Sequence, residues 1–401
     1  GGWRRPPGPP GLPAWDPGCG AARLMAQHGV GHVCVVDRGQ LVGVVCERDL
    51  FSLQRVGLVN LSRAITRAES VETLSALGGD VHRLIGQMLA QGASVEQLTQ
   101  IIAALNDSLT RRVIELITDE MGTPETPFTW LSFGSEGRQE QTLKTDQDNG
   151  ILFRTPNGKS AEQVREELLP LAKRINDALD RCGFPLCRGG VMAGNAKCCL
   201  SLEEWRNRFG RWIDQGTPEH LLYATIYFDL RPLYGDPAPA HELRAWLIDS
   251  VAANSRFRHQ MAGNALRNRP PLGLIRDFKV SSRGEYPHTL DLKVQGLAPF
   301  VDGARLYALA NRVNETNTMA RLRGTAEAGA LNAVDVDAWA EAYHFIQLLR
   351  MRTHQRQAEE GRPLSNHIDP DTLNELDRRI LKEAFRQARK LQSKLALEYQ
   401  L

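Results

Sequence analysis

The sequence lacks the features that would assign it to a membrane or to a nucleic acid. No apolar run reaches the roughly 18 residues that a membrane-spanning helix needs, and the 24% of charged residues is ordinary for a soluble globular protein. Only 6% of the residues are aromatic and the formal net charge is +2, so the composition does not indicate a basic surface that binds nucleic acid. We therefore expect no membrane partner and no nucleic-acid partner.

Cysteine and histidine are also missing from the patterns that bind zinc. The seven cysteines include no Cys-x-x-Cys pair, which argues against a zinc ribbon and, in a chain of 401 residues, against a disulfide framework. No His-Glu-x-x-His motif is present, so the sequence does not indicate a zinc hydrolase. A reduced, cytoplasmic protein is the expectation.

What the chain does have is a Gly-Ser turn after an apolar segment, in residues 133–138, Phe-Gly-Ser-Glu-Gly-Arg. Gly134 lets a phosphate approach the backbone, because glycine has no Cβ. Ser135 adds a hydroxyl donor and is expected to cap a helix that starts there, where backbone N–H groups bind anions. Arg138, about one turn further on, can reach a phosphate oxygen. The turn therefore predicts a nucleotide-phosphate site.

Two aspartates follow in residues 145–149, Thr-Asp-Gln-Asp-Asn. Side chains at i and i+2 of a strand share a face, so Asp146 and Asp148 are predicted to point the same way, roughly 6 to 7 Å apart. Such a pair can ligate Mg²⁺ (or Mn²⁺) together with water and the phosphates of an NTP substrate. The alternative is a polar turn. A calcium loop is excluded, because its fifth and sixth positions would be Gly150 and Ile151.

Hydrophobic periodicity predicts both strands and helices. The expected strands are 33–36, 41–46, 128–133 and 150–153, and the segment 221–230 is either a helix or a strand. Helices are expected over 21–28, from residue 47, along the apolar stripe from Leu98 to Ile117, and over 164–182. From about residue 266 the chain is expected to be mostly helical.

With these residues in view, the chain resembles the nucleotidyltransferase superfamily that includes DNA polymerase β. That superfamily carries Gly-Ser and then Asp-x-Asp on a small mixed sheet. In particular the chain looks like bacterial signal-transduction proteins that join CBS domains to a PII-uridylyltransferase-like nucleotidyltransferase and end in a helical substrate-binding domain. The match is carried by residues 133–151, 189–195, 228–236, 291–293 and 366–370.

The resemblance implies that the Gly-Ser turn binds the nucleotide phosphates and that the aspartate pair binds the metal. The superfamily usually adds a third carboxylate on a later strand, but the nearest strand, residues 185–190, contains no acid. Asp229 is the candidate in its place, and a buried ion-pair corner is the alternative for this residue. Lys293 is a further candidate in the C-terminal part: it either faces the substrate cleft or is a solvated lysine.

Residues 33–50 resemble the second half of a CBS domain. In that family the aspartate that ends the Gly43–Asp49 pattern binds the ribose of an adenine nucleotide, and a Ser or Thr binds phosphate. Asp49 fits, whereas Cys46 replaces the hydroxyl. Since CBS repeats work in pairs and one copy is recognisable, a homodimer through this module is expected; the alternative is a truncated module that only packs against its neighbours.

The predicted fold class is multidomain α/β. The expected parts are a Pro/Gly-rich disordered start (1–18), a partial CBS domain (19–56), a helical linker (75–122), a polymerase-β-like nucleotidyltransferase domain (123–258) and an all-helical substrate-binding domain (259–401). The predicted function is metal-dependent transfer of a nucleoside monophosphate from an NTP to a protein acceptor, such as a PII-like regulator, in signal transduction. The alternatives are a catalytically inactive nucleotide-binding sensor and nucleotidyl transfer to a small molecule.

Overall fold

The computed structural model describes residues 11–13, 32–37, 40–273, 278–280 and 282–401. The chain divides into two compact units, Gly1–Arg67 and Ala68–Leu401, which are described one at a time. Within those described ranges, no helix combines the length and the apolar character that crossing a bilayer requires.

The first unit contains a three-stranded sheet followed by a helix. Its elements are β1 (Gly11–Pro13), β2 (His32–Asp37), β3 (Gln40–Cys46) and α2 (Glu47–Arg67). β2 runs parallel to β1 and antiparallel to β3. Both predicted strands and the helix from residue 47 are confirmed, whereas β1 falls in the stretch expected to be disordered. The helix predicted over 21–28 and the turn at 38–39 lie outside the described residues.

A mixed four-stranded sheet of order β6-β5-β4-β7 forms the centre of the second unit. Its strands are β4 (Phe128–Ser132), β5 (Asn149–Phe153), β6 (Cys199–Ser201) and β7 (Arg231–Tyr234). β4 is antiparallel to β5 and β7, and β5 is parallel to β6. Every residue of β4 and β5 is buried, which is why these strands read as nearly continuous apolar runs in the sequence.

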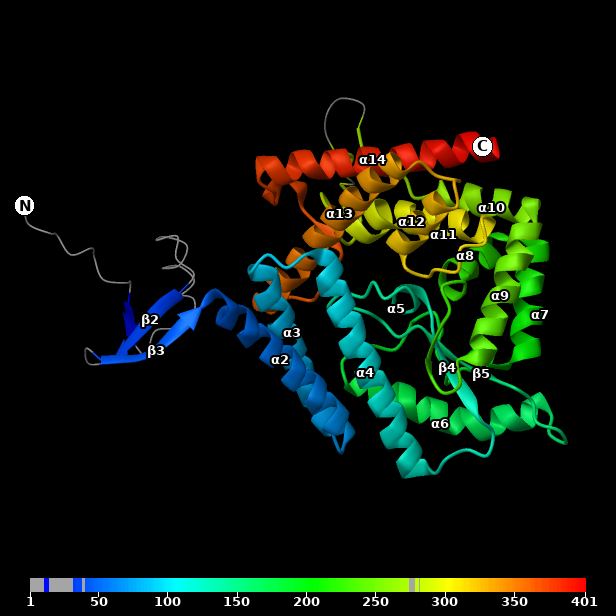
Figure 1. Ribbon diagram of the computed structural model, residues 1–401. Coiled ribbons are helices and arrows are strands. Elements are labelled where there is room, and N and C mark those ends of the chain that lie inside the picture. The colour runs from blue at the N-terminus through cyan, green and yellow to red at the C-terminus, as the bar shows by residue number, and fades with distance from the viewer. Residues whose placement is uncertain (1–10, 14–31, 38–39, 274–277, 281) are drawn as a thin grey trace, which may run out of the picture. The chain divides into compact units, whose positions relative to one another are not determined.

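Helices enclose this sheet, with α4 and α6 on one side of β4 and β5 and with α7 and α9 on the other (Figure 1). The segment 221–230, left open by its sequence, is helical up to Tyr227, where α8 ends, and a turn follows. α4 begins at a capping box between Ser94 and Gln97 and ends at Gly122. The bounds are α3 (Val71–Ala90), α4 (Val95–Met121), α5 (Gly134–Gly137), α6 (Ala161–Arg181), η1 (Ala196–Cys198), α7 (Leu202–Gln215), α8 (Pro218–Tyr227) and α9 (Ala238–Ala253).

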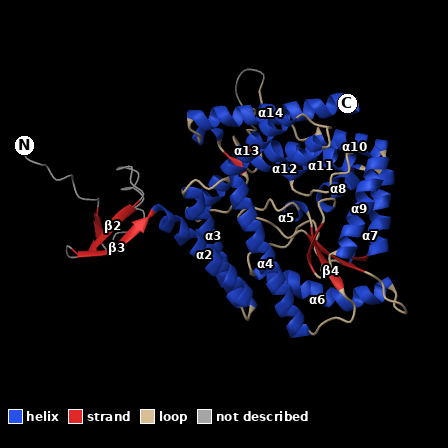
Figure 2. Cartoon of the chain, in the orientation of Figure 1, coloured by secondary structure: helices blue, strands red, loops and turns tan. Residues whose placement is uncertain are grey.

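The C-terminal part is a group of packed helices, as Figure 2 shows. They are α10 (Ser255–Ala265), the π-helix η2 (Leu292–Leu297), α11 (Ala298–Ala310), α12 (Thr318–Glu327), α13 (Ala333–Glu359), η3 (Pro370–Thr372) and α14 (Glu375–Tyr399). The prediction that this part is all-helical misses one short antiparallel ladder, β8 (Leu290–Asp291) with β9 (His367–Ile368). That ladder joins two of the stretches on which the family resemblance rests.

One hydrophobic core joins the sheet to the C-terminal helices. It includes Leu131 of β4, Trp205 of α7, Phe300 of α11 and Leu391 of α14. The Trp205 indole N–H donates to the carbonyl oxygen of Ile151 at 3.0 Å, so this large side chain is buried with its polar atom satisfied. The sheet and the C-terminal helices therefore stabilise each other through shared apolar burial.

Gly137, at the end of α5, allows this helix to lie against the chain at Asp229. A Cβ at position 137 would collide with the carbonyl oxygen of Asp229 and lie 2.9 Å from that of Ser132. We expect Gly137→Ala to lower the free energy of unfolding by about 2–4 kcal/mol, because backbone atoms cannot rotate away. Urea unfolding measures this loss, with Gly79→Ala in α3 as the control. A Cβ at position 79 meets nothing within 4 Å, so this substitution should be neutral or stabilising. Equal effects would contradict the prediction.

Candidate functional site

The Gly-Ser turn and the second aspartate are in direct contact where β4 ends and β5 begins. The Phe133 N–H donates to the carbonyl oxygen of Asp148 at 2.8 Å, which continues the β4–β5 ladder. Gly134 has a φ of +52°, and a Cβ there would lie 2.7 Å from Oδ2 of Asp148. Glycine is thus required both by the left-handed backbone and by the nearby carboxylate.

Asp148 has few groups in the chain to balance its charge. Within the described residues, its carboxylate accepts one hydrogen bond, from the Cys187 thiol at 3.5 Å. Burial raises the pKa of Asp148 to about 6; the Cys187 hydrogen bond and the positive charge of Lys293 lower it, and the negative charge of Asp146 raises it further. A half-buried carboxylate with a thiol as its donor is poorly satisfied. This donor chemistry fits a hard divalent cation.

Asp146 and Asp148 lie on the irregular segment just before β5, not inside a strand as predicted. Between them Gln147 is buried, and its amide donates to the carbonyl oxygens of Asn176 and Phe184 at 3.0 and 2.8 Å. Asp146 is exposed. Of the two carboxylates, Asp148 lines the same cavity as Lys293.

A network of amide groups fixes this segment from behind. Asn176 of α6 donates to Oε1 of Gln147 at 2.7 Å and to Oδ1 of Asn149 at 3.0 Å. Asn149 Oδ1 also accepts the Ala193 N–H at 2.8 Å, and Asn176 Oδ1 accepts the Gly194 N–H at 2.7 Å. The stretch 189–195, noted for its resemblance alone, therefore supports the backbone that carries the aspartates.

Ser135 and Arg138 differ from their predicted roles in detail. α5 is one turn of four residues whose N-cap is Phe133, with no side-chain cap, so Ser135 does not cap it. Ser135 instead lines the cavity described below. Arg138 also lines that cavity, but its guanidinium donates to Glu140 Oε2 at 2.8 Å and to Asp229 Oδ2 at 2.7 Å. The charge of Arg138 is therefore already balanced within the protein.

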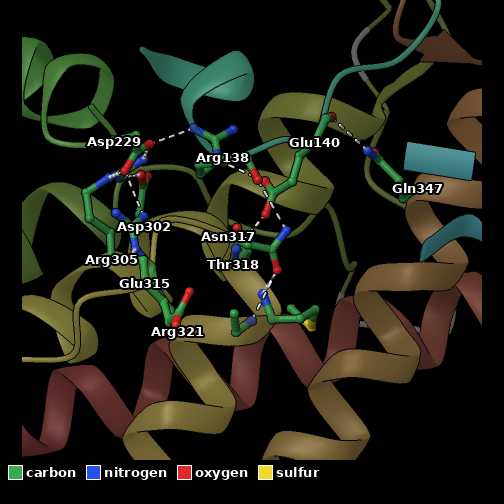
Figure 3. Close-up of polar contacts among 12 residues, drawn as sticks. Arg138, Glu140, Asp229, Asp302, Arg305, Glu315, Asn317, Thr318, Arg321 and Gln347 are labelled. Carbon is green, nitrogen blue, oxygen red and sulfur yellow. Dashed lines mark hydrogen bonds and ion pairs between the residues drawn. The ribbon is translucent and has the colours of Figure 1, made fainter. Parts of the chain in front are cut away.

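Asp229 lies between arginines of three elements (Figure 3). Its Oδ1 accepts from Arg305 Nε at 2.9 Å and Arg321 Nη1 at 2.7 Å, and its Oδ2 accepts from Arg138 Nη1 and Arg305 Nη2, both at 2.7 Å. Burial alone would raise the pKa of this fully buried carboxyl, yet the three arginines hold the pKa well below its usual range. Since a carboxylate has about four lone-pair sites, none is left for a metal. The geometry favours the ion-pair alternative over a catalytic Asp229.

A cavity of about 470 Å³ connects these groups with the C-terminal helices. Gly134, Ser135 and Asp148 line one part of it. Apolar side chains line another part: Leu222, Ile226, Leu297 and Val301. A volume of this size, with an apolar wall and a few polar groups, is typical of a small-molecule site.

Glu136 is a buried acid of the turn that the sequence analysis missed. The Ser132 hydroxyl donates to its Oε1 at 3.0 Å. Burial, with the negative charge of Asp107, raises the pKa of Glu136 to about 8, so this carboxyl is protonated at neutral pH. Arg231 pairs with Asp107 through bonds of 2.9 and 2.8 Å and also donates to the Glu136 carbonyl oxygen. No local signal marks Glu136, because its protonation depends on residues distant in the sequence.

The CBS-like site stays a prediction. Asp49 belongs to α2, but its side chain is outside the described residues. Cys46, which stands at the hydroxyl position of the pattern, ends β3 and is half-buried.

Glu136→Gln tests the protonation of Glu136. Because the pKa is about 8 in the folded protein and near 4.3 in the unfolded chain, the folded state binds more protons between these values. The free energy of unfolding should therefore fall as the pH rises through this range. Glutamine does not titrate, so this pH-dependent loss of stability is absent from the variant. Glu136→Gln should therefore be more stable than the wild type by on the order of 1–3 kcal/mol at pH 8, with little difference near pH 5. Urea unfolding at both pH values measures this, and a pH-independent difference would contradict it.

Asp229→Asn tests the three-arginine cluster. The neutral amide leaves the buried Arg321 without a counter-charge and removes one of the carboxylates bonded to Arg138 and Arg305, so we expect the free energy of unfolding to drop by about 3–5 kcal/mol. The matched control is Asp249→Asn, since Asp249 pairs with Arg312 at 3.0 Å on the exposed surface. That change should cost less than about 1 kcal/mol. Urea unfolding of both variants measures the two losses in the free energy of unfolding. Equally small losses would show that the three-arginine cluster does not stabilise the fold.

Family models match three parts of the chain. The model described as Putative nucleotidyltransferase DUF294 matches residues 79–219, the Putative nucleotidyltransferase substrate binding domain matches residues 255–399, and the CBS domain matches residues 21–55. The chain matches no curated protein. These matches confirm the predicted architecture and support nucleotidyl transfer in general. The chain therefore carries a CBS region, a central nucleotidyltransferase domain and a C-terminal helical region that matches the putative substrate-binding domain.

Proposed function

We propose that this protein transfers a nucleoside monophosphate from an NTP to a hydroxyl group of an acceptor protein, with Mg²⁺ or Mn²⁺ as cofactor. The observation that carries the proposal is the contact between the Asp148 carboxylate and the Gly134-Ser135 turn inside one cavity. A turn that can hold phosphates beside a poorly satisfied carboxylate brings together the two groups that such a transfer needs.

Asp146 and Asp148 are the residues that would hold the metal. Among the residues that the structure describes, no group of three or more His, Cys, Asp or Glu side chains is arranged to hold one. We therefore propose a two-carboxylate site completed by water and by the phosphates of the NTP, a ligand set that suits Mg²⁺. When bound, the metal supplies charge that stabilises the phosphate oxygens and lowers the pKa of the attacking hydroxyl.

The chain's own groups position the substrate. The Ser135 hydroxyl and the first N–H groups of α5 would donate to phosphate oxygens, since the opening N–H groups of a helix have no acceptor within it. The acceptor oxygen bonds to the α-phosphorus while the bond from that phosphorus to the β-phosphate oxygen breaks. The leaving pyrophosphate takes the electron pair, and the hydroxyl proton passes to water. Asp229 acts as a positioning residue, because it holds Arg138 beside the turn.

The proposed acceptor is a protein, such as a PII-like regulator in a signalling pathway, and this follows the resemblance to PII-uridylyltransferases. One local feature supports a macromolecular acceptor. Leu222 lines the cavity and is 58% exposed, so an apolar side chain at the cavity wall is open to contact with a docking protein.

The second candidate is a nucleotide-binding sensor without transfer activity. The saturated carboxylate of Asp229 favours it, because the third catalytic acid that the superfamily usually carries has no equivalent at this position. In that case nucleotide would bind at the turn without release of pyrophosphate.

Label transfer from each of the four α-labelled NTPs, in host cell extract with Mg²⁺ or Mn²⁺, tests the proposal. We expect label on a discrete protein and a loss of about 100-fold or more in the Asp146→Asn/Asp148→Asn protein, because the metal ligands are gone. Asp249→Asn, an exposed aspartate outside the cavity, is the control and should transfer label like the wild type. Absence of transfer with all four NTPs, while nucleotide still binds, would overturn transfer in favour of the sensor.

A further inference from the structure

The cavity carries more positive charge than its carboxylates balance. Its lining includes five cationic side chains, Arg138, Arg267, Lys293, Arg305 and Arg350, against the carboxylates of Glu140, Asp148 and Asp302. Arg138 and Arg305 are already bonded to acids, namely Glu140, Asp229 and Asp302. The other three cations have no ion pair with any described residue.

Arg350 of α13 is the most unusual of these cations, because it is only 6% exposed. Its Nε donates to Asn366 Oδ1 at 2.6 Å and its Nη1 to Gln347 Oε1 at 3.5 Å, so both acceptors are neutral amides. Burial lowers the pKa of Arg350 to about 10, while Tyr343 and Asp291 raise it. A buried guanidinium without a bonded carboxylate is costly. An anionic ligand in the cavity would remove that cost.

Lys293 brings a second free charge to the same cavity. Its ammonium has no hydrogen bond or ion pair among the described residues, and the side chain lines the same cavity as Arg350 and Asp148. Desolvation, with the charge of Arg350, lowers the pKa of Lys293, while the charge of Asp148 raises it. The backbone beneath it is fixed, since Asp291 Oδ1 accepts the N–H groups of Lys293 and Val294, both at 2.9 Å.

Asn366 connects the two cations. Its side chain accepts from Arg350, and its carbonyl oxygen accepts the N–H of Leu292, next to Lys293, at 3.0 Å. The β8–β9 ladder joins the stretches 291–293 and 366–370, to which the sequence analysis gave no role. Lys293 and Arg350, which these stretches support, line one cavity.

We propose that Lys293 and Arg350 form an anion subsite that binds the β- and γ-phosphates of the NTP, the part that leaves as pyrophosphate. The subsite rests on the proposed function, in which the α-phosphate lies at the aspartates and the Gly-Ser turn. Asp148, Lys293 and Arg350 line the same cavity, so a triphosphate can extend from the Asp148 carboxylate to the two cations. The C-terminal domain then contributes directly to nucleotide binding.

Binding of inorganic pyrophosphate to the full chain in the presence of Mg²⁺, measured by isothermal titration calorimetry, tests the subsite. Lys293→Met should weaken pyrophosphate binding by about 10-fold or more, because it removes a charged donor. Lys293→Arg should recover most of this affinity. Lys390→Met, on the exposed face of α14 and outside the cavity, should bind like the wild type. Arg350→Gln should also weaken binding, with its thermal unfolding showing that it is folded.

Nucleoside monophosphates provide the second readout, since they lack the β- and γ-phosphates. Their affinity should change less than about twofold in Lys293→Met. Equal weakening of monophosphate and pyrophosphate, unchanged pyrophosphate affinity in Lys293→Met, or no binding of pyrophosphate to the wild type would each overturn the subsite. Label transfer is a separate measurement: its absence beside an intact pyrophosphate response would overturn the transfer proposal and leave the subsite standing.

Discussion

The joint between the sheet and the C-terminal helices depends on the buried charge of Asp229. Its carboxylate accepts hydrogen bonds from the guanidinium groups of Arg138, just after α5, of Arg305 in α11 and of Arg321 in α12, and apolar contacts do not have this directionality. Burying a carboxylate is unfavourable unless its lone pairs are filled, and here all of them are. Arg138, the end of the Gly-Ser turn and the first residues of α12 are thereby held in one arrangement, and the geometry of the cavity follows from it.

The site illustrates how one segment can be rigid and still reactive. Gln147 and Asn149 face inward and are fully occupied by the amide network around Asn176. Asp146, by contrast, is exposed, and Asp148 accepts a single hydrogen bond, from the Cys187 thiol, among the described residues. Polar satisfaction on one side of the backbone thus leaves unsatisfied charge on the other, where a ligand can use it. The same division appears in the C-terminal part, where Asn366 orders Arg350 without neutralising it.

Sequence predicts what depends on local spacing. Strands β4 and β5 and the helix α4 are predicted from apolar runs and from an apolar stripe at helical spacing. The role of Asp229 could not be read in this way, because two of its arginines lie 76 and 92 residues further along the chain. The pKa of Glu136 depends likewise on Asp107. The predicted cap at Ser135 is wrong, because α5 begins one residue earlier, at Gly134, and Phe133 is its N-cap.

The core that runs without a break from Leu131 to Leu395 has a consequence for how the cavity is filled. Two halves that share their apolar interior and a buried ionic cluster cannot swing apart on a hinge at small cost. The cavity is therefore preformed, and a ligand enters and leaves it without a movement of the two parts. Discrimination between nucleotides would then rest on fit to a rigid shape, lock-and-key, and not on a closing movement that completes the site after binding.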